Sequence, residues 1–153
     1  MIHIIEYKDQ YAADFKALNL EWLDKYHLTE SHDLMVLDDP RGTILDRGGY
    51  VWLAVDAPGG QVVGTAALAY EHDHCYELAK MSVAPAFRGR GVSKLLIEQC
   101  LHKARELGAK KLILYSNSQL QTALRLYQQY GFQHVPVVDA PFVTADVKME
   151  LQW

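Results

Sequence analysis

The stretch that decides the fold runs from Glu77 to Leu96: Glu77-Leu78-Ala79-Lys80-Met81-Ser82-Val83-Ala84-Pro85-Ala86-Phe87-Arg88-Gly89-Arg90-Gly91-Val92-Ser93-Lys94-Leu95-Leu96. Residues 76–83 predict a β-strand, and the glycine-rich turn after them leads directly into a helix that ends before Gly108. Unpaired N–H groups at the start of a helix, beside glycines that let a ligand approach the backbone, make an anion site that the helix dipole strengthens. The turn from Arg88 to Ser93 is therefore expected to bind a phosphate group.

Two common phosphate-binding motifs do not fit this turn. A Walker motif is excluded because no Gly-Lys-Ser/Thr stands at the required spacing. The dinucleotide fingerprint is excluded because Lys94 occupies its third glycine position. The pattern that remains is Arg-x-x-Gly-x-Ser between a strand and a helix.

The rest of the chain reads as alternating short strands and helices. Strands are predicted over residues 2–7, 50–56, 61–70, 76–83, 111–115, 132–138 and 143–151, and helices over 11–23, 31–37 and 92–107, with a further helix capped by Ser118 and stopped by Gly131. Residues 111–115 are nearly all apolar and follow a helix, which indicates a right-handed crossover and a parallel neighbouring strand. The sequence predicts an α+β domain with a mixed sheet.

Composition places this domain among ordinary globular proteins. The 153 residues are 50% hydrophobic with a formal net charge of −4, so we expect a single domain over 1–153 without nucleic-acid or membrane partners. Cys75 and Cys100 read as buried apolar residues, and no signal peptide or membrane span is recognisable. These features favour a cytoplasmic protein. The segment from Glu71 to His74 reads as a polar turn rather than a zinc site, and no metal is expected.

The Arg88-x-x-Gly91-x-Ser93 turn resembles the pyrophosphate-binding motif of the GNAT superfamily of acyl-CoA N-acyltransferases, usually Gln/Arg-x-x-Gly-x-Gly/Ala. Residues 77–83 are similar to that family's fourth strand, 123–132 to its alanine, Leu-Tyr and Gly-Phe helix and exit, and 146–151 to the closing strand of a bacterial branch. The resemblance covers about residues 50–153. It implies a GNAT fold: a mostly antiparallel sheet of about seven strands, flanked by about four helices, whose parallel fourth and fifth strands splay at the cofactor site.

The resemblance implies acetyl-CoA as the acyl donor. Its pyrophosphate would lie on the backbone N–H groups of Arg88, Gly89, Arg90, Gly91, Val92 and Ser93, and its pantetheine arm along Met81, Ser82 and Val83. Ser93 replaces the usual Gly or Ala, and its hydroxyl can donate to phosphate. The family's asparagine lies seven residues before its tyrosine, where this chain has Leu120. Asn117 lies ten before, so its contact with the cofactor is left open.

Two side chains match the family's proton-transfer groups. An amine enters largely as ammonium, with a pKa of about 10.4 for a lysine-type group, so a base must take a proton before attack. Glu77 matches the fourth-strand carboxylate, and Tyr127 matches the tyrosine that protonates the departing thiolate. From spacing alone Tyr127 reads as core packing. The alternative for Glu77 is a solvated strand residue or a partner of Lys80 or Arg88, with ordered water as the base.

Together these features predict an N-acetyltransferase that moves an acetyl group to a primary amine of a small molecule or peptide by direct attack in a ternary complex. A non-catalytic acyl-CoA sensor is the alternative. Acidic residues outnumber basic ones over residues 8–49, which hints at a cationic acceptor. Trp22, Tyr26, Tyr50 and Trp52 either line the acceptor site or fill the core, and a homodimer is left open.

Overall fold

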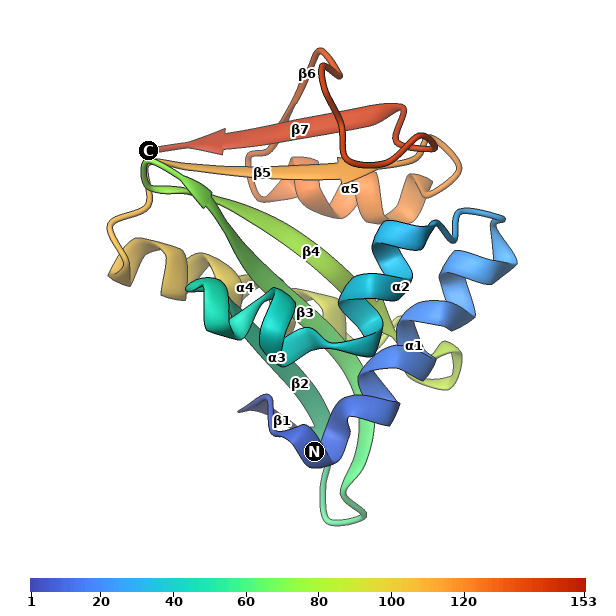
Figure 1. Cartoon of the computed structure of the whole chain (residues 1–153). Helices are drawn as coiled ribbons and strands as arrows, with labels where there is room; N and C mark the ends of the chain where they lie inside the picture. The colour runs from blue at the N-terminus through green and yellow to red at the C-terminus, as the bar shows by residue number, and fades with distance from the viewer.

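The computed structural model describes residues 1–153 as one seven-stranded sheet between two layers of helices (Figure 1). Along the sheet the strand order is β1-β2-β3-β4-β5-β7-β6, and every neighbouring pair is antiparallel except β4 and β5. The strands are β1 (Ile2–Glu6), β2 (Tyr50–Asp56), β3 (Gln61–His72), β4 (Cys75–Val83), β5 (Lys111–Ser116), β6 (Gln133–Val135) and β7 (Val147–Gln152). The predicted α+β class with a mixed sheet is confirmed.

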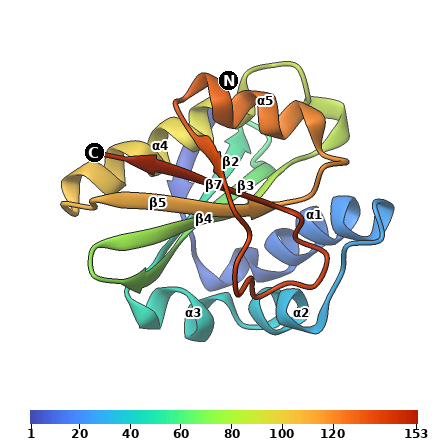
Figure 2. The ribbon, with the colours of Figure 1, turned by 90° about the horizontal axis from the view of Figure 1, so that it is seen from above.

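Five α-helices cover the two faces of the sheet (Figure 2). On one face lie α1 (Ala12–Lys25), α2 (Ser31–Asp38) and the single turn α3 (Pro40–Thr43), and on the other lie α4 (Val92–Glu106) and α5 (Gln121–Gln129). The prediction of about four helices missed α3, which Asp39 caps by accepting a hydrogen bond from the Gly42 N–H. No helix is both long and apolar enough to cross a membrane.

The core consists of two apolar clusters, one on each face of the sheet. Alternate residues of β3 belong to different clusters: Ala66 and Leu68 pack beneath α4, and Ala67 packs with Phe15 of α1. This two-residue alternation is the ordinary geometry of a strand. Because both faces are covered, β3 is buried continuously from Val62 to Leu68 and reads as one apolar run.

Strands β4 and β5 pair only at their beginnings. Their register ends at Glu77 opposite Ile113, and beyond this point β4 continues to Val83 while β5 continues to Ser116 without pairing. The splay expected from the family resemblance is confirmed. It leaves the edge of β4 after Glu77 without a strand partner on the side that faces β5.

A bulge interrupts β4 beyond the splay. Thr65 of β3 pairs with Ser82 and Ala67 pairs with Ala79, so Ala66 lies opposite both Lys80 and Met81. Lys80 has a φ of 51°, a left-handed conformation that is uncommon for a residue with a side chain. Such a bulge re-aims the side chains that follow it.

Several predicted boundaries were wrong near the C-terminal part of the chain. Helix α5 begins at Gln121, not at Ser118, because the Ser118 N–H and hydroxyl both donate to Asp146. The last two strands are shorter than the predicted 132–138 and 143–151, because the loop between them binds to α2 and to the β5–α5 connection instead of pairing. Between β3 and β4 the turn is shorter too, since only Asp73 and His74 lie outside strands.

Candidate active site

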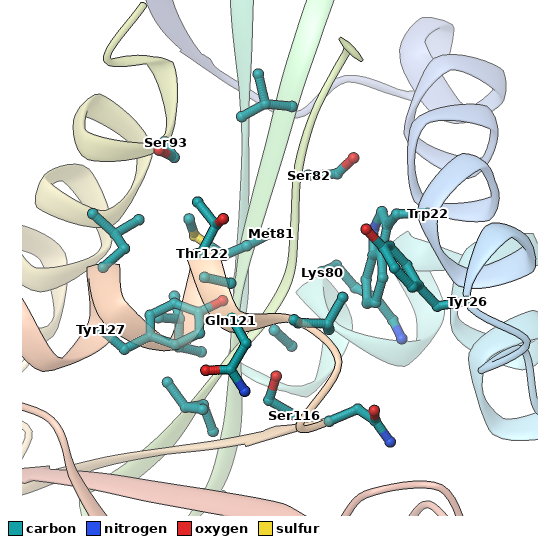
Figure 3. A pocket seen from close by; sticks show the side chains of 18 of the residues that line it. Trp22, Tyr26, Lys80, Met81, Ser82, Ser93, Ser116, Gln121, Thr122 and Tyr127 are labelled. Atoms are coloured by element: carbon teal, nitrogen blue, oxygen red, sulfur yellow. The ribbon is translucent and has the colours of Figure 1, made fainter. Parts of the chain in front are cut away.

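A cleft of about 820 Å³ opens where β4 and β5 separate (Figure 3). Its walls come from α1, α2, β4, the turn before α4, the end of β5, α5 and the loop before β7. All the predicted site residues line it except Arg90; those that do are Glu77, Met81, Ser82, Val83, Arg88, Gly89, Gly91, Val92, Ser93, Asn117 and Tyr127. The fold thus brings residues from four separate segments to one cavity.

The turn before α4 presents a run of free backbone donors. None of the N–H groups from Gly89 to Lys94 donates to a protein acceptor, and Gly91, the N-cap of α4, has no side-chain cap. Gly89 and Gly91 have φ values of 79° and 78°, and no heavy atom lies within 4 Å of the space that a Cβ would occupy. These residues fit a diphosphate, because the N–H groups face open space at the positive end of a helix.

The two arginines of this turn differ in their surroundings. Arg88 donates from Nε to the Val83 carbonyl at 3.1 Å and from Nη2 to Glu21 at 2.9 Å, which joins the turn to α1. Arg90 lies outside the cleft, with its guanidinium 5.0 Å from the centre of the Phe87 ring. Only the backbone of Arg90 belongs to the row of free donors.

The free edge of β4 runs from the splay to the turn. Met81 and Val83 pack against the cluster beneath α4, whereas Ser82 is buried and its hydroxyl donates to the Leu18 carbonyl of α1 at 2.8 Å. The Ser82 side chain therefore holds α1 against β4. Main-chain groups along this edge are what an extended ligand arm can pair with.

Glu77 lies half-buried on β4 at the last paired position before the splay. Burial raises the pKa of the Glu77 carboxyl to about 8, and a hydrogen bond with Glu71 and the negative charge of that residue add to the effect. A carboxyl group with a pKa near neutrality can accept and release a proton under ordinary conditions. The raised pKa favours acid–base chemistry over a fixed charge.

Tyr127 lies on α5 with its hydroxyl pointing into the cleft (Figure 3). The side chain is 8% exposed, its ring packs edge-on against Phe132 at 6.0 Å, and no protein group bonds its hydroxyl. Burial, followed by the nearby Cys100 thiol, raises the pKa of Tyr127 to about 12. The ring thus belongs to the core, as its spacing predicted, while the hydroxyl faces the cavity; the role of proton donor stays a prediction.

Asn117 lines the cleft but its amide is already engaged. Its Nδ2 donates to the Thr144 carbonyl at 2.8 Å and its Oδ1 accepts from the Gln119 N–H at 3.0 Å. Glu30 holds the same loop from the other side by accepting from the N–H groups of Val143 and Thr144, both at 2.9 Å. The loop before β7 is thus fastened across one end of the cleft.

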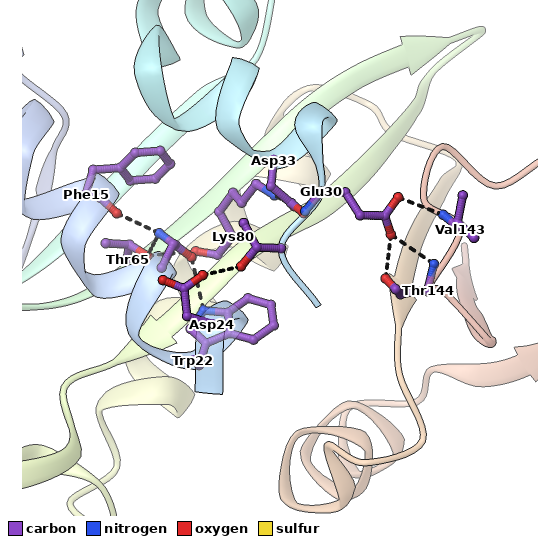
Figure 4. A network of polar contacts seen from close by, with 11 residues as sticks. Phe15, Trp22, Asp24, Glu30, Asp33, Thr65, Lys80, Val143 and Thr144 are labelled. Atoms are coloured by element: carbon purple, nitrogen blue, oxygen red, sulfur yellow. Dashed lines mark hydrogen bonds and ion pairs between the residues drawn. The ribbon is translucent and has the colours of Figure 1, made fainter. Parts of the chain in front are cut away.

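A buried polar network supports the β4 bulge (Figure 4). The Thr65 hydroxyl donates to the Lys80 carbonyl at 2.7 Å and accepts from Asn19 Nδ2 at 3.1 Å. Lys80 pairs with Asp33 of α2, and the two side chains are 7% and 2% exposed. The sequence analysis assigned no role to Asn19, Thr65 or Asp33. No local signal marks these residues, because Lys80 is charged but so is Glu77 of the same strand.

Six acidic residues of the N-terminal helices are engaged within the protein. Glu21, Asp33 and Asp38 form ion pairs with Arg88, Lys80 and Lys16. Asp24, Glu30 and Asp39 accept hydrogen bonds from Thr29, Thr144 and the Gly42 N–H, which are neutral donors. The expectation of a cationic acceptor came from counting these charges, and the three ion pairs weaken it.

Comparisons with known proteins agree with this geometry. The model of the acetyltransferase (GNAT) family matches residues 13–132. YjgM, an N-acetyltransferase of Escherichia coli (strain K12), is 34% identical over 118 residues, covering 72% of this chain and 70% of that protein. A GNAT-family acetyltransferase from Staphylococcus aureus Mu50 superposes with a TM-score of 0.91 at 21% identity, over 99% of both chains.

A second solved structure with a similar fold is a complex with coenzyme A. The PaiA N-acetyltransferase of Thermoplasma acidophilum superposes with a TM-score of 0.78 at 14% identity, covering 100% of this chain and 99% of that one. At such identities the superpositions show the fold alone. The family match, the relative and the splayed β4–β5 pair agree, and this chain belongs to the GNAT family of acetyltransferases.

Proposed function

We propose that the protein transfers an acetyl group from acetyl-CoA to a primary amine of a small molecule or peptide, by direct attack within a ternary complex. The observation that carries the proposal is one continuous cleft with free N–H groups at one end and with the side chains of Glu77 and Tyr127 among its lining. The diphosphate would lie on the N–H groups from Gly89 to Lys94. The pantetheine arm would follow the free edge of β4 towards Glu77.

Three groups of the chain would act on the reacting atoms. Glu77 would take a proton from the ammonium, either directly or through water, because its pKa of about 8 lies between those of water-exposed carboxyls and amines. A backbone N–H of β4 near the bulge would polarise the thioester carbonyl, and one such donor is worth about 2.7–4 kcal/mol in transition-state stabilisation. Tyr127 would donate its proton to the departing thiolate sulfur.

The test is release of free thiol from acetyl-CoA in the presence of a panel of primary amines. We expect thiol release that depends on the amine and forms one acetylated product per thiol, which mass spectrometry would detect. A protein that acetyl-CoA stabilises against heat, but that releases no thiol with any amine, would act as an acyl-CoA sensor instead. Absence of both binding and turnover would contradict the assignment of the cleft to acetyl-CoA.

A further inference from the structure

We propose that the acceptor is an amine of the amino-acid type, with a carboxylate close to the reacting nitrogen, and that Lys80 binds this carboxylate while the amine faces Glu77. The inference rests on the proposed function and names its substrate class. It is carried by the position of Lys80, whose ammonium is buried, only partly engaged, and on the same side of β4 as Glu77 in one cleft.

The β4 bulge is what brings Lys80 to this side. In a regular strand Lys80 would share a face with Leu78, which packs in the cluster beneath α4. Its left-handed backbone, with a φ of 51°, turns the side chain towards Asp33 of α2 on the opposite face. Lys80 therefore joins Glu77 on the side of α1 and α2, and its charge lowers the pKa of Glu77 against the larger raising effects.

The Lys80 ammonium has donors to spare. An ammonium group has three N–H donors, and here one is given to Asp33 while the charge lies 5.3 Å from the centre of the Phe142 ring. Both carboxylate oxygens of Asp33 already have donors: one accepts from Lys80 and the other from the Glu30 N–H, and the side chain is only 2% exposed. The charge that this pair presents to the cleft is therefore positive.

The two side chains suit a small zwitterion. Lys80 lies three positions after Glu77 on β4, and its charge acts on the Glu77 carboxyl strongly enough to lower that group's pKa. A ligand that spans the two groups therefore needs its amine and its carboxylate close together. Covalent geometry places the nitrogen and the carboxylate oxygens of an α-amino acid about 3 Å apart. A peptide acceptor, whose carboxylate is remote from its N-terminal amine, would leave the Lys80 donors unused.

The rest of this end of the cleft is uncharged and largely aromatic. Trp22 of α1, Tyr26 directly after α1 and Phe142 of the loop line it, whereas the acidic residues Asp24 and Glu30 do not. A polyamine would thus meet a positive charge and no free carboxylate other than Glu77. The surroundings favour an amino acid with an apolar side chain.

The experiment compares leucine, methionine and phenylalanine with the corresponding amides and decarboxylated amines, in the thiol-release assay. We expect kcat/KM for each amino acid to exceed that for its amide by roughly 10- to 100-fold, the range for a hydrogen bond to a charged group. Equal values for acid and amide would overturn the inference and leave the transferase proposal standing. In parallel, equilibrium binding of acid and amide to the protein saturated with coenzyme A measures the same preference without turnover.

Variants then assign the preference to Lys80. Because Lys80→Met alone would leave Asp33 buried without a partner, the variant carries Asp33→Asn as well, and the amide oxygen of the new side chain can still accept from the Glu30 N–H. We expect its acid-to-amide ratio to fall to about 1, and Lys80→Arg to retain a preference. Because acid and amide are measured with the same protein sample, their ratio does not depend on the fraction of the variant that is folded. Lys25→Met, at a lysine that lies over the Tyr26 ring but does not line the cleft, is the matched control and should keep the wild-type ratio.

An unchanged ratio in the double variant would overturn the role of Lys80. Failure of every amine in the thiol assay would contradict the proposed function, and the binding arm would still decide the inference. There, tighter binding of the acid than of the amide supports recognition of a carboxylate, and equal binding overturns it.

Discussion

Tyr127 has a packed ring and a hydroxyl that no protein group bonds, so the core position that its spacing predicts is compatible with the proposed role of proton donor. A phenol whose pKa is about 12 is fully protonated at neutral pH and is able to donate. We expect Tyr127→Phe to lower kcat by roughly 10²-fold or more, the usual contribution of a general acid, with little change in the KM for acetyl-CoA. Steady-state kinetics would measure both.

Tyr130 provides a matched control for this substitution. It also lies at the end of α5 and has a pKa of about 12, but its hydroxyl donates to Glu98 and it does not line the cleft. Tyr130→Phe should leave kcat near the wild-type value. A wild-type rate in Tyr127→Phe would remove that hydroxyl from the mechanism.

Glu77 should set the pH dependence of the reaction. As a base it acts only when ionised, so kcat/KM for the amine should rise with pH, reach half of its maximum near pH 8 and level off above it. Glu77→Gln should abolish this limb. Glu71→Gln should move the limb to lower pH, since Glu71 raises the pKa of Glu77. If the Glu77→Gln profile matched the wild type, water would be the base.

The same pKa affects stability with a definite sign. The folded state holds the Glu77 proton more tightly than the unfolded chain, whose carboxyl has its ordinary pKa of 4.5, so the free energy of unfolding falls as pH rises from about 4.5 to about 8. Glu77→Gln should reduce this loss. Thermal unfolding at pH 5 and pH 9 would measure it as a smaller drop in Tm than in the wild type.

At the scale of the element, the β4 bulge depends on contacts from three other segments. Thr65→Val removes the hydroxyl that holds the Lys80 carbonyl and leaves that carbonyl and Asn19 Nδ2 each without one partner. We expect a loss of stability of about 1–3 kcal/mol and a larger fall in kcat than in acetyl-CoA affinity. Thr65→Ser keeps the hydroxyl and should restore both. Equal kcat in the two variants would show that the bulge does not position the reacting groups.

Much of the element pattern could be predicted, and nearly all the residues predicted for the site line the cleft. The strand, turn and helix from residue 76 to 107 follow from apolar spacing and glycine punctuation, and the splay followed from the family resemblance. The network of Asn19, Thr65 and Asp33 could not be predicted, because it joins residues distant in sequence at a bulge that no local pattern marks. The prediction that Ser118 caps α5 was wrong for a similar reason, because its hydroxyl donates instead to Asp146, which lies 28 residues away.

At the scale of the whole molecule, the cleft lies between the two halves of the sheet, so a ligand there should stabilise the entire domain. At 100 times its Kd, acetyl-CoA would add about 2.7 kcal/mol. For a chain of this size that corresponds to a rise in Tm of roughly 5–10 °C. Differential scanning fluorimetry with and without acetyl-CoA would measure the shift.

Substitution of two glycines distinguishes the effect of backbone strain on Tm from the effect of ligand binding in that experiment. Gly91 and Gly108 have φ values of 78° and 71° with open space around each, so alanine at either should cost about 1–2 kcal/mol in stability. Only Gly91 lines the cleft. Gly91→Ala should lose most of the acetyl-CoA shift and Gly108→Ala should keep it. A full shift in both variants would place the diphosphate elsewhere.

The position of β7 has a consequence for biosynthesis. This strand, residues 147–152, is inserted between β5 and β6 and pairs with β5 along its whole length. During translation β5 therefore exposes an unsatisfied edge until the ribosome has released these residues, some 30 positions later. Until residues 147–152 have been made and paired, that edge of β5 is open to pairing with other chains.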